Sequence, residues 1–101
     1  MSRLRDAARG QPCQIRVPSY CSGNPETVVA CHYRLAGTCG VGMKPPDFLI
    51  AFGCAACHDC VDGRIRTNYT RDELRLMHCE GVMRTQILLH KAGLLSEGKR
   101  L

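Results

Sequence analysis

The sequence predicts a small α+β protein with a helix near the N-terminus and a long helix near the C-terminus. Three observations support this class. Residues 26–35 are rich in β-branched side chains, as expected of a strand. Thr70 and Glu73 have capping-box spacing and precede an apolar-faced helix over residues 71–92. Between these segments, Cys54-Ala-Ala-Cys-His concentrates metal-binding side chains in one turn.

The N-terminal half predicts short elements joined by turns. An amphipathic helix is expected over residues 2–9, with Ser2 as its N-cap, and Gly10 and Pro12 end it. Apolar and polar residues then alternate over residues 13–17, which predicts a short strand and a turn with a cysteine at each end. The later segments are a turn at 22–25, the strand at 26–35, a glycine- and proline-rich loop at 37–46, and a short strand or buried turn at 48–52.

The C-terminal half predicts a brief helix after Cys57, interrupted by Gly63, and then the long helix, which stops near Gly93. Gly81 indicates either close packing or a break in this helix. Residues 96–101 form a polar tail. The side of the long helix that faces the core is expected to consist of Leu74, Met77, Val82, Leu88 and Leu89. His78 and His90 are expected on the helix surface. Arg71, Arg75 and Arg84 are expected on a solvated face that can also meet DNA.

With 101 residues the chain is expected to form one domain, residues 1–101. Its hydrophobic core is small, so we expect it to need further stabilisation by disulfides or a bound metal. Eight cysteines can supply disulfides or metal ligands. The first ten residues carry charges throughout and do not form a secretory signal, and no later run is apolar enough to cross a membrane. We therefore expect a cytoplasmic protein, in which Cys-x-x-Cys beside histidine indicates a metal site.

The predicted structural zinc site combines two pairs of thiolates. Cys54 and Cys57 have the strict spacing of a zinc turn, and Cys13 and Cys21 supply the missing half of a four-thiolate site. Two alternatives stay open: Cys39 as a competing ligand, and His58 as a fourth ligand beside three cysteines. The remaining thiols are interpreted as structural; they are Cys31, Cys60 and Cys79.

The formal net charge is +5, from fourteen basic and nine acidic side chains. This balance favours a polyanionic partner such as DNA, although a solvated basic surface with no partner has the same composition. The basic residues near the histidines are candidates for phosphate contacts; they are Arg34, Lys44, Arg64 and Arg66.

A set of short runs gives the sequence a family resemblance. They are Asn24-Pro-Glu-Thr, His32-Tyr-Arg-Leu-Ala-Gly, Lys44-Pro-Pro-Asp and Cys54-Ala-Ala-Cys-His-Asp. Their order resembles the zinc-stapled branch of the HNH, or His-Me finger, endonucleases. More narrowly, it is similar to the YbcO family of small phage and prophage proteins named as nucleases.

The resemblance implies a ββα-metal core and a metal-dependent DNA endonuclease. His32 would be the general base, and His58 and Asp62 would hold a catalytic Mg²⁺ or Mn²⁺. Asp47 is the nearest polar candidate for orienting His32, and Cys31 stands where many HNH enzymes carry an aspartate ligand. The alternative function is a zinc-stabilised nucleic-acid-binding or phage recombination accessory protein without hydrolytic activity. A third possibility is a structural protein, in which the basic net charge has no binding partner.

Overall fold

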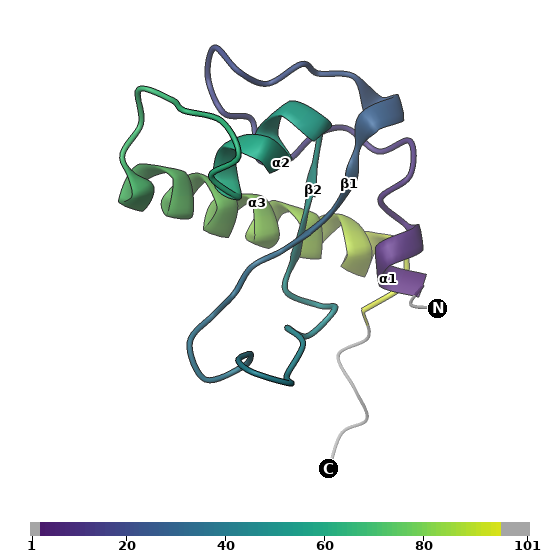
Figure 1. The fold of residues 1–101 in the computed structure, drawn as a ribbon. Coiled ribbons are helices and arrows are strands. Elements are labelled where there is room, and N and C mark those ends of the chain that lie inside the picture. The colour runs from purple at the N-terminus through teal and green to yellow at the C-terminus, as the bar shows by residue number, and fades with distance from the viewer. Residues whose placement is uncertain (1–2, 96–101) are drawn as a thin grey trace.

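A computed structural model describes residues 3–95 as an α+β arrangement around a two-stranded antiparallel sheet (Figure 1). In chain order the elements are α1 (Arg3–Asp6), the 3-10 helix η1 (Pro25–Thr27), β1 (Val29–His32), β2 (Ile50–Gly53), α2 (Ala55–Val61) and α3 (Arg71–Lys91). The predicted fold class is therefore confirmed at this level. No helix within residues 3–95 is long and apolar enough to cross a membrane.

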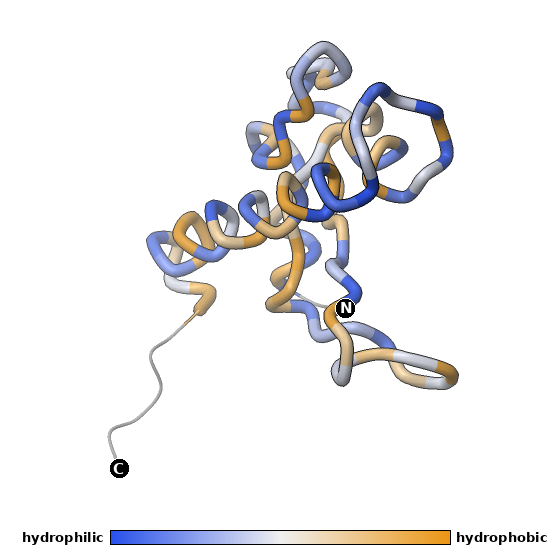
Figure 2. Tube along the Cα trace, turned by 90° about the vertical axis from the view of Figure 1, so that its left-hand side faces the viewer, coloured by the Kyte–Doolittle hydropathy of each residue, from blue (hydrophilic) through white to orange (hydrophobic). Residues whose placement is uncertain are grey.

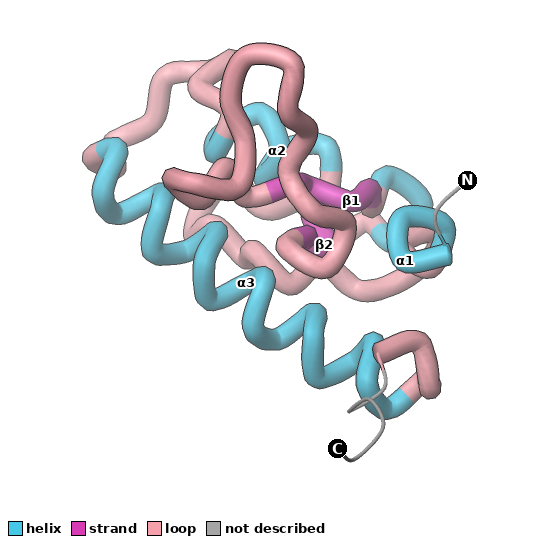
Figure 3. Tube along the Cα trace, turned by 90° about the horizontal axis from the view of Figure 1, so that it is seen from below, coloured by secondary structure: helices cyan, strands magenta, loops and turns pink. Residues whose placement is uncertain are grey.

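The sheet and α3 form the centre of the molecule. Strands β1 and β2 pair from Val29 opposite Gly53 to His32 opposite Ile50. Helix α3 packs mainly against β2 and lies across one side of the molecule along its whole length (Figure 3). The amide of Phe52 in β2 donates to the Thr85 hydroxyl in α3 at 2.9 Å. The largest fully buried apolar side chains are Phe52, Ile15, Ile50, Leu89 and Val17.

Helix α3 follows the sequence prediction closely. The Thr70 amide donates to Glu73 Oε1 at 2.8 Å, and the Glu73 amide donates to Thr70 Oγ1 at 3.1 Å, which completes the capping box. The helix ends at Lys91, and Gly93 then adopts a φ of 76°. The helix is unbroken at Gly81, where an added Cβ would lie 3.2 Å from the Ala51 Cβ. Of the two readings of Gly81, close packing is confirmed.

Two of the five α3 side chains that the sequence places on the helix surface, His78 and Arg84, are buried or half-buried instead. His78 is buried, its Nε2 lies 3.0 Å from the Cys31 carbonyl oxygen, and its ring meets Tyr33 edge-on at 5.2 Å. Arg84 is half-buried and donates through Nε and Nη2 to the Gln14 carbonyl, at 3.0 and 2.6 Å. Both residues therefore tie α3 to neighbouring segments. His90 is exposed, as predicted.

The predicted strand at residues 13–17 is absent. This segment makes a single backbone bond to the sheet, from the Gln14 amide to the Phe52 carbonyl. Arg16 and Ser19 have φ angles of 57° and 70°, which lie in the left-handed region and bend the chain out of an extended path. The bends keep Ile15 and Val17 in the core and turn the two flanking cysteines inward.

Three further elements differ from prediction in their limits. The strand expected over 26–35 is confined to Val29–His32, because the Asn24 side chain caps η1 by accepting from the Glu26 amide. Helix α2 starts at Ala55, before Cys57, because the Cys54 sulfur caps it, and it ends ahead of Gly63. Helix α1 covers only Arg3–Asp6. The Ser2 cap and the tail at 96–101 lie outside the described residues.

Candidate metal centre and candidate active site

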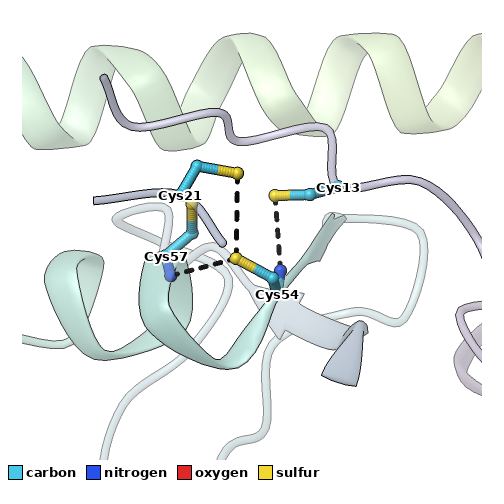
Figure 4. A group of neighbouring side chains, drawn as sticks. All are labelled: Cys13, Cys21, Cys54 and Cys57. Carbon is cyan, nitrogen blue, oxygen red and sulfur yellow. Dashed lines mark hydrogen bonds between the residues drawn. The ribbon is translucent and has the colours of Figure 1, made fainter. Parts of the chain in front are cut away.

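Four cysteines from two separate segments meet at the start of α2. The thiols of Cys13, Cys21, Cys54 and Cys57 all lie within 4.8 Å of one another (Figure 4). The Cys21 and Cys54 sulfurs are 3.8 Å apart, too far for a disulfide, in which sulfurs are about 2 Å apart. A tetrahedral zinc with bonds of about 2.3 Å separates its sulfurs by about 3.8 Å. The group can therefore hold a metal ion such as zinc.

Backbone amides surround these sulfurs and favour their charged form. The Cys54 amide donates to Cys13 Sγ at 3.3 Å, the Cys57 amide to Cys54 Sγ at 3.5 Å, and the Val17 amide to Cys57 Sγ at 3.4 Å. A hydrogen bond from Cys57 lowers the pKa of Cys13 to about 4 and in turn raises the pKa of the Cys57 thiol. This hydrogen bond favours the thiolate form of Cys13, which is the form that binds metals.

The two alternative ligands lie outside this four-cysteine group. The Cys39 thiol contacts the Leu35 carbonyl in the loop between the strands, at 3.9 Å. His58 Nε2 pairs instead with Asp62 Oδ2, at 3.0 Å. Cys31 and Cys60 are fully buried, and burial raises the pKa of the Cys31 thiol to about 12. The Cys31 sulfur lies 3.7 Å from the Val29 carbonyl oxygen, outside the four-cysteine group.

A second candidate site is a cavity of about 570 Å³ between the end of β1, the end of α2 and the start of α3. Its wall carries basic, aromatic and acidic side chains together. Those with the chemistry of interest are His32, Asp62, Arg34, Arg66, Arg71, Arg75, Tyr33, Tyr69 and His78. The fold thus brings His32 and Asp62, thirty residues apart in the chain, to one cavity.

His32 is the last residue of β1, and a carboxylate holds its ring. Its Nε2 lies 2.8 Å from Asp47 Oδ1, and the Asp47 carboxylate also pairs with Arg5 Nε at 3.5 Å. Asp47 precedes β2, so the antiparallel pairing returns it to the end of β1 where His32 lies. The structure therefore brings Asp47, the residue that the sequence suggests for orienting His32, into contact with that histidine.

His58 and Asp62 lie one turn apart on α2 and pair with each other, as their spacing predicts. Asp62 Oδ2 also forms an ion pair with Arg64 Nη2 at 3.3 Å. Of this pair, Asp62 lines the same cavity as His32, whereas His58 is not among the residues that line it.

The four phosphate candidates separate into two groups. Arg34 and Arg66 line the cavity, whereas Lys44 lies in the loop between the strands and Arg64 pairs with Asp59 and Asp62. The cavity also includes Arg71 and Arg75, which the sequence places on a solvated helix face that can also meet DNA. Their spacing of one turn at the start of α3 is the signal that could have placed them together.

An aromatic wall that the sequence does not indicate completes the cavity. The Arg75 guanidinium lies 5.6 Å from the Tyr33 ring centre and donates to the Tyr33 hydroxyl at 3.1 Å. Tyr69 meets Tyr20 edge-on at 6.2 Å and donates to the Pro18 carbonyl. These contacts fix the ring positions, and the cavity presents cations and rings together, a combination suited to nucleic acid.

Comparison with known proteins places the chain in a family. The family model described as "Putative nuclease YbcO" matches residues 2–94, so the chain belongs to the YbcO family. It is 45% identical over 98 residues to "Putative nuclease YbcO" of Escherichia coli strain K12, covering 94% of this chain and 98% of that protein. A protein of Enterobacteria phage 82 carrying the same description is 45% identical over the same length and coverage.

A solved structure shares the fold. It is titled "Structure of a putative bacteriophage protein from Escherichia coli str. K-12 substr. MG1655" and superposes with a TM-score of 0.77 at 40% identity, covering 90% of this chain and all of that chain. The small α+β arrangement described above is therefore also found in an experimental structure of a similar protein.

Proposed function

We propose that the protein is a metal-dependent DNA endonuclease of the HNH, or His-Me finger, type, stabilised by a structural zinc. One observation carries the proposal: His32, held by Asp47, and Asp62 open onto the same arginine-lined cavity. Membership of the YbcO family, whose description names a nuclease, agrees with it.

The order of the elements supports this type of nuclease. An antiparallel pair, β1 and β2, is followed directly by α2. In this arrangement the end of the first strand supplies the base, and the helix supplies the ligands of the ion. Cys54 and Cys57 at the start of α2 would tie that helix, through zinc, to Cys13 and Cys21.

His32 acts as the general base in this proposal. If Nε2–H donates to the Asp47 carboxylate, the Nδ1 lone pair is free to accept a proton from water. The Asp47 charge then stabilises the imidazolium that forms, as a carboxylate does behind other catalytic histidines. Histidine suits this task because its protonation changes near neutral pH.

His58 and Asp62 are the residues that would hold the divalent ion. A carboxylate suits Mg²⁺, and the added imidazole makes Mn²⁺ equally suitable. Cys31, whose sulfur contacts the Val29 carbonyl oxygen within β1, is not part of this proposed ligand set. When bound, such an ion polarises the phosphate and stabilises charge on the leaving oxygen.

The arginines around the cavity bind the substrate backbone in this proposal. Arg34 and Arg66 come from segments flanking the His32–Asp62 pair, and Arg71 and Arg75 come from the first turns of α3. Guanidinium groups from several directions can contact successive phosphates and hold the scissile bond beside His32.

The test is nicking of a supercoiled plasmid by the pure protein in Mg²⁺ or Mn²⁺. Wild-type protein should nick, and His32→Ala should lose at least about a hundredfold in rate while retaining its fold and zinc content. His90→Ala, a change at an exposed histidine of α3, is the matched control and should nick normally. DNA binding without cleavage in every divalent ion would reject the endonuclease.

A further inference from the structure

The loop between β1 and β2 presents bulky apolar side chains to solvent where it projects furthest. Its course away from the rest of the molecule is visible in two perpendicular views (Figures 1 and 2). Val41 is fully exposed, and Met43 is 56% exposed. Single apolar side chains scattered over a monomer's surface are normal, whereas apolar side chains grouped on one projecting loop indicate a contact surface.

The tip of this loop has a defined shape. Gly40 and Met43 exchange two backbone hydrogen bonds, of 3.3 and 3.0 Å, around a tight turn. Gly42 adopts a φ of 76°, which this turn needs and which glycine supplies without strain. Val41 is thus held at the apex of the turn. A tip that is already ordered loses little conformational entropy when it binds.

The loop is also anchored firmly at its base. The Tyr33 amide donates to the Leu49 carbonyl at 2.8 Å, which extends the strand pairing by one bond. Gln86 of α3 donates to the Phe48 carbonyl at 2.8 Å. The His32–Asp47 contact closes the same end. The tip is therefore carried on a fixed stem beside the candidate base.

Charge indicates the kind of partner that the tip would meet. Residues 34–46 contain two cations, Arg34 and Lys44, and no acidic side chain. Lys44 follows Met43 directly, and Arg34 also lines the cavity that holds His32. An anionic partner that contacts the tip would therefore extend toward the cavity.

We propose that residues 34–46 are a wedge that enters duplex DNA beside the cleaved phosphate. Val41 and Met43 press between base pairs, and Arg34 and Lys44 contact the flanking phosphates. Apolar side chains used in this way unstack one base step and bend the duplex. The inference rests on the proposed function, because the duplex that the tip enters is the one whose phosphodiester bond His32 would cleave.

The test compares two double variants in the His32→Ala background, so that DNA stays uncleaved. Val41→Ser with Met43→Ser removes the wedge, and Met83→Ser with Ile87→Ser removes a half-exposed apolar pair from α3. Binding is followed with a duplex containing 2-aminopurine, whose fluorescence rises on unstacking. The wedge variant should bind at least about tenfold more weakly, with an unchanged salt dependence and no fluorescence rise.

Several results would overturn the wedge. They are normal affinity and fluorescence in the wedge variant, equal losses in the α3 variant, or loss only of binding to anionic phospholipid vesicles. Plasmid nicking by the wild-type protein tests the proposed function separately. If the wild-type protein nicks DNA and the wedge variant binds DNA normally, the wedge is rejected and the proposed function stands. Absence of any DNA binding would reject both.

Discussion

At the scale of single residues, the contact between His32 and Asp47 determines what the cavity can do. A carboxylate 2.8 Å from Nε2 favours the tautomer that is protonated at Nε2, and in that tautomer Nδ1 is a proton acceptor. The geometry adds a measured contact to the sequence prediction, in which Asp47 is the nearest polar candidate for orienting His32. Its position opposite His32 depends on the strand register.

Replacing Asp47 with asparagine should slow plasmid nicking by about a hundredfold or more, since an amide can hold the wrong tautomer of His32. Arg5→Gln removes the other ion pair of Asp47 and is the matched control, with an expected change of less than about threefold. Wild-type rates in Asp47→Asn, measured under saturating metal, would remove Asp47 from the proposed mechanism.

His78 gives a prediction about stability and pH. Burial lowers the pKa of His78 in the folded protein, so the unfolded chain binds its proton more readily. Stability from neutral His78 is therefore present above the unfolded pKa, about 6.5, and is lost as pH falls below it. His78→Gln should show a shallower loss of denaturation free energy between about pH 7 and 5. An identical slope in both proteins would contradict the burial effect.

The sequence pattern misplaced His78 for a physical reason. The buried face of α3 includes His78, Gly81, Val82, Thr85 and Leu89, and only two of these five are large apolar residues. Periodicity arguments count apolar side chains, so a polar side chain that is satisfied by a hydrogen bond inside the core escapes them.

At the scale of elements, local chemistry decided which predictions succeeded. The capping box of α3 acts within four residues and was predictable from spacing alone. The bend at residues 13–17 was not, because the alternating pattern indicates burial of Ile15 and Val17 but reveals neither the left-handed φ of Arg16 nor the burial of Gln14. That conformation is compatible with the burial of both Ile15 and Val17 and of the adjacent Cys13.

Thr70→Ala should lower the free energy of unfolding by about 1 kcal/mol, because Glu73 loses the hydroxyl that accepts its amide hydrogen. Chemical denaturation measures this change. Thr38→Ala, which removes a threonine bond within the exposed loop, should change stability by less than half as much. Equal losses in the two variants would show that the cap does not determine the stability of α3.

Gly53, at the end of β2, packs so tightly against neighbouring core side chains that it has no room for a Cβ atom. An added Cβ would lie 2.6 Å from the Ile15 Cδ1 and 2.9 Å from the Cys31 sulfur, both within the core. Gly53→Ala should therefore destabilise the protein by about 1–3 kcal/mol. Gly40→Ala meets no atom within 4 Å and serves as the control. A neutral Gly53→Ala in the same denaturation experiment would mean that Ile15 can move aside.

At the scale of the whole molecule, one short helix connects the two candidate centres. Cys54 and Cys57 open α2 at the thiol cluster, and Asp62 follows its last residue at the cavity. The spacing of these residues was visible in the sequence. The cavity itself was not, because its wall comes from three separated segments whose approach depends on packing of α3 against β2.

Zinc should be present in purified protein, at one ion per chain by elemental analysis, and chelation should unfold it. Cys54→Ser should lose both metal and cooperative unfolding, because three thiolates leave the site incomplete. Cys39→Ser lies outside the cluster and should retain both. Full stability of the wild type after complete removal of zinc would argue against a structural metal.

The most direct test of the central claim is the nicking rate of zinc-loaded protein as Mn²⁺ is titrated. We expect His58→Ala to shift the half-saturating Mn²⁺ concentration upward by about tenfold or more, whereas His32→Ala should stay inactive at every concentration with zinc retained. Nicking by His32→Ala at the wild-type rate, or a His58→Ala titration that overlays the wild type, would contradict the assignment of base and metal ligand.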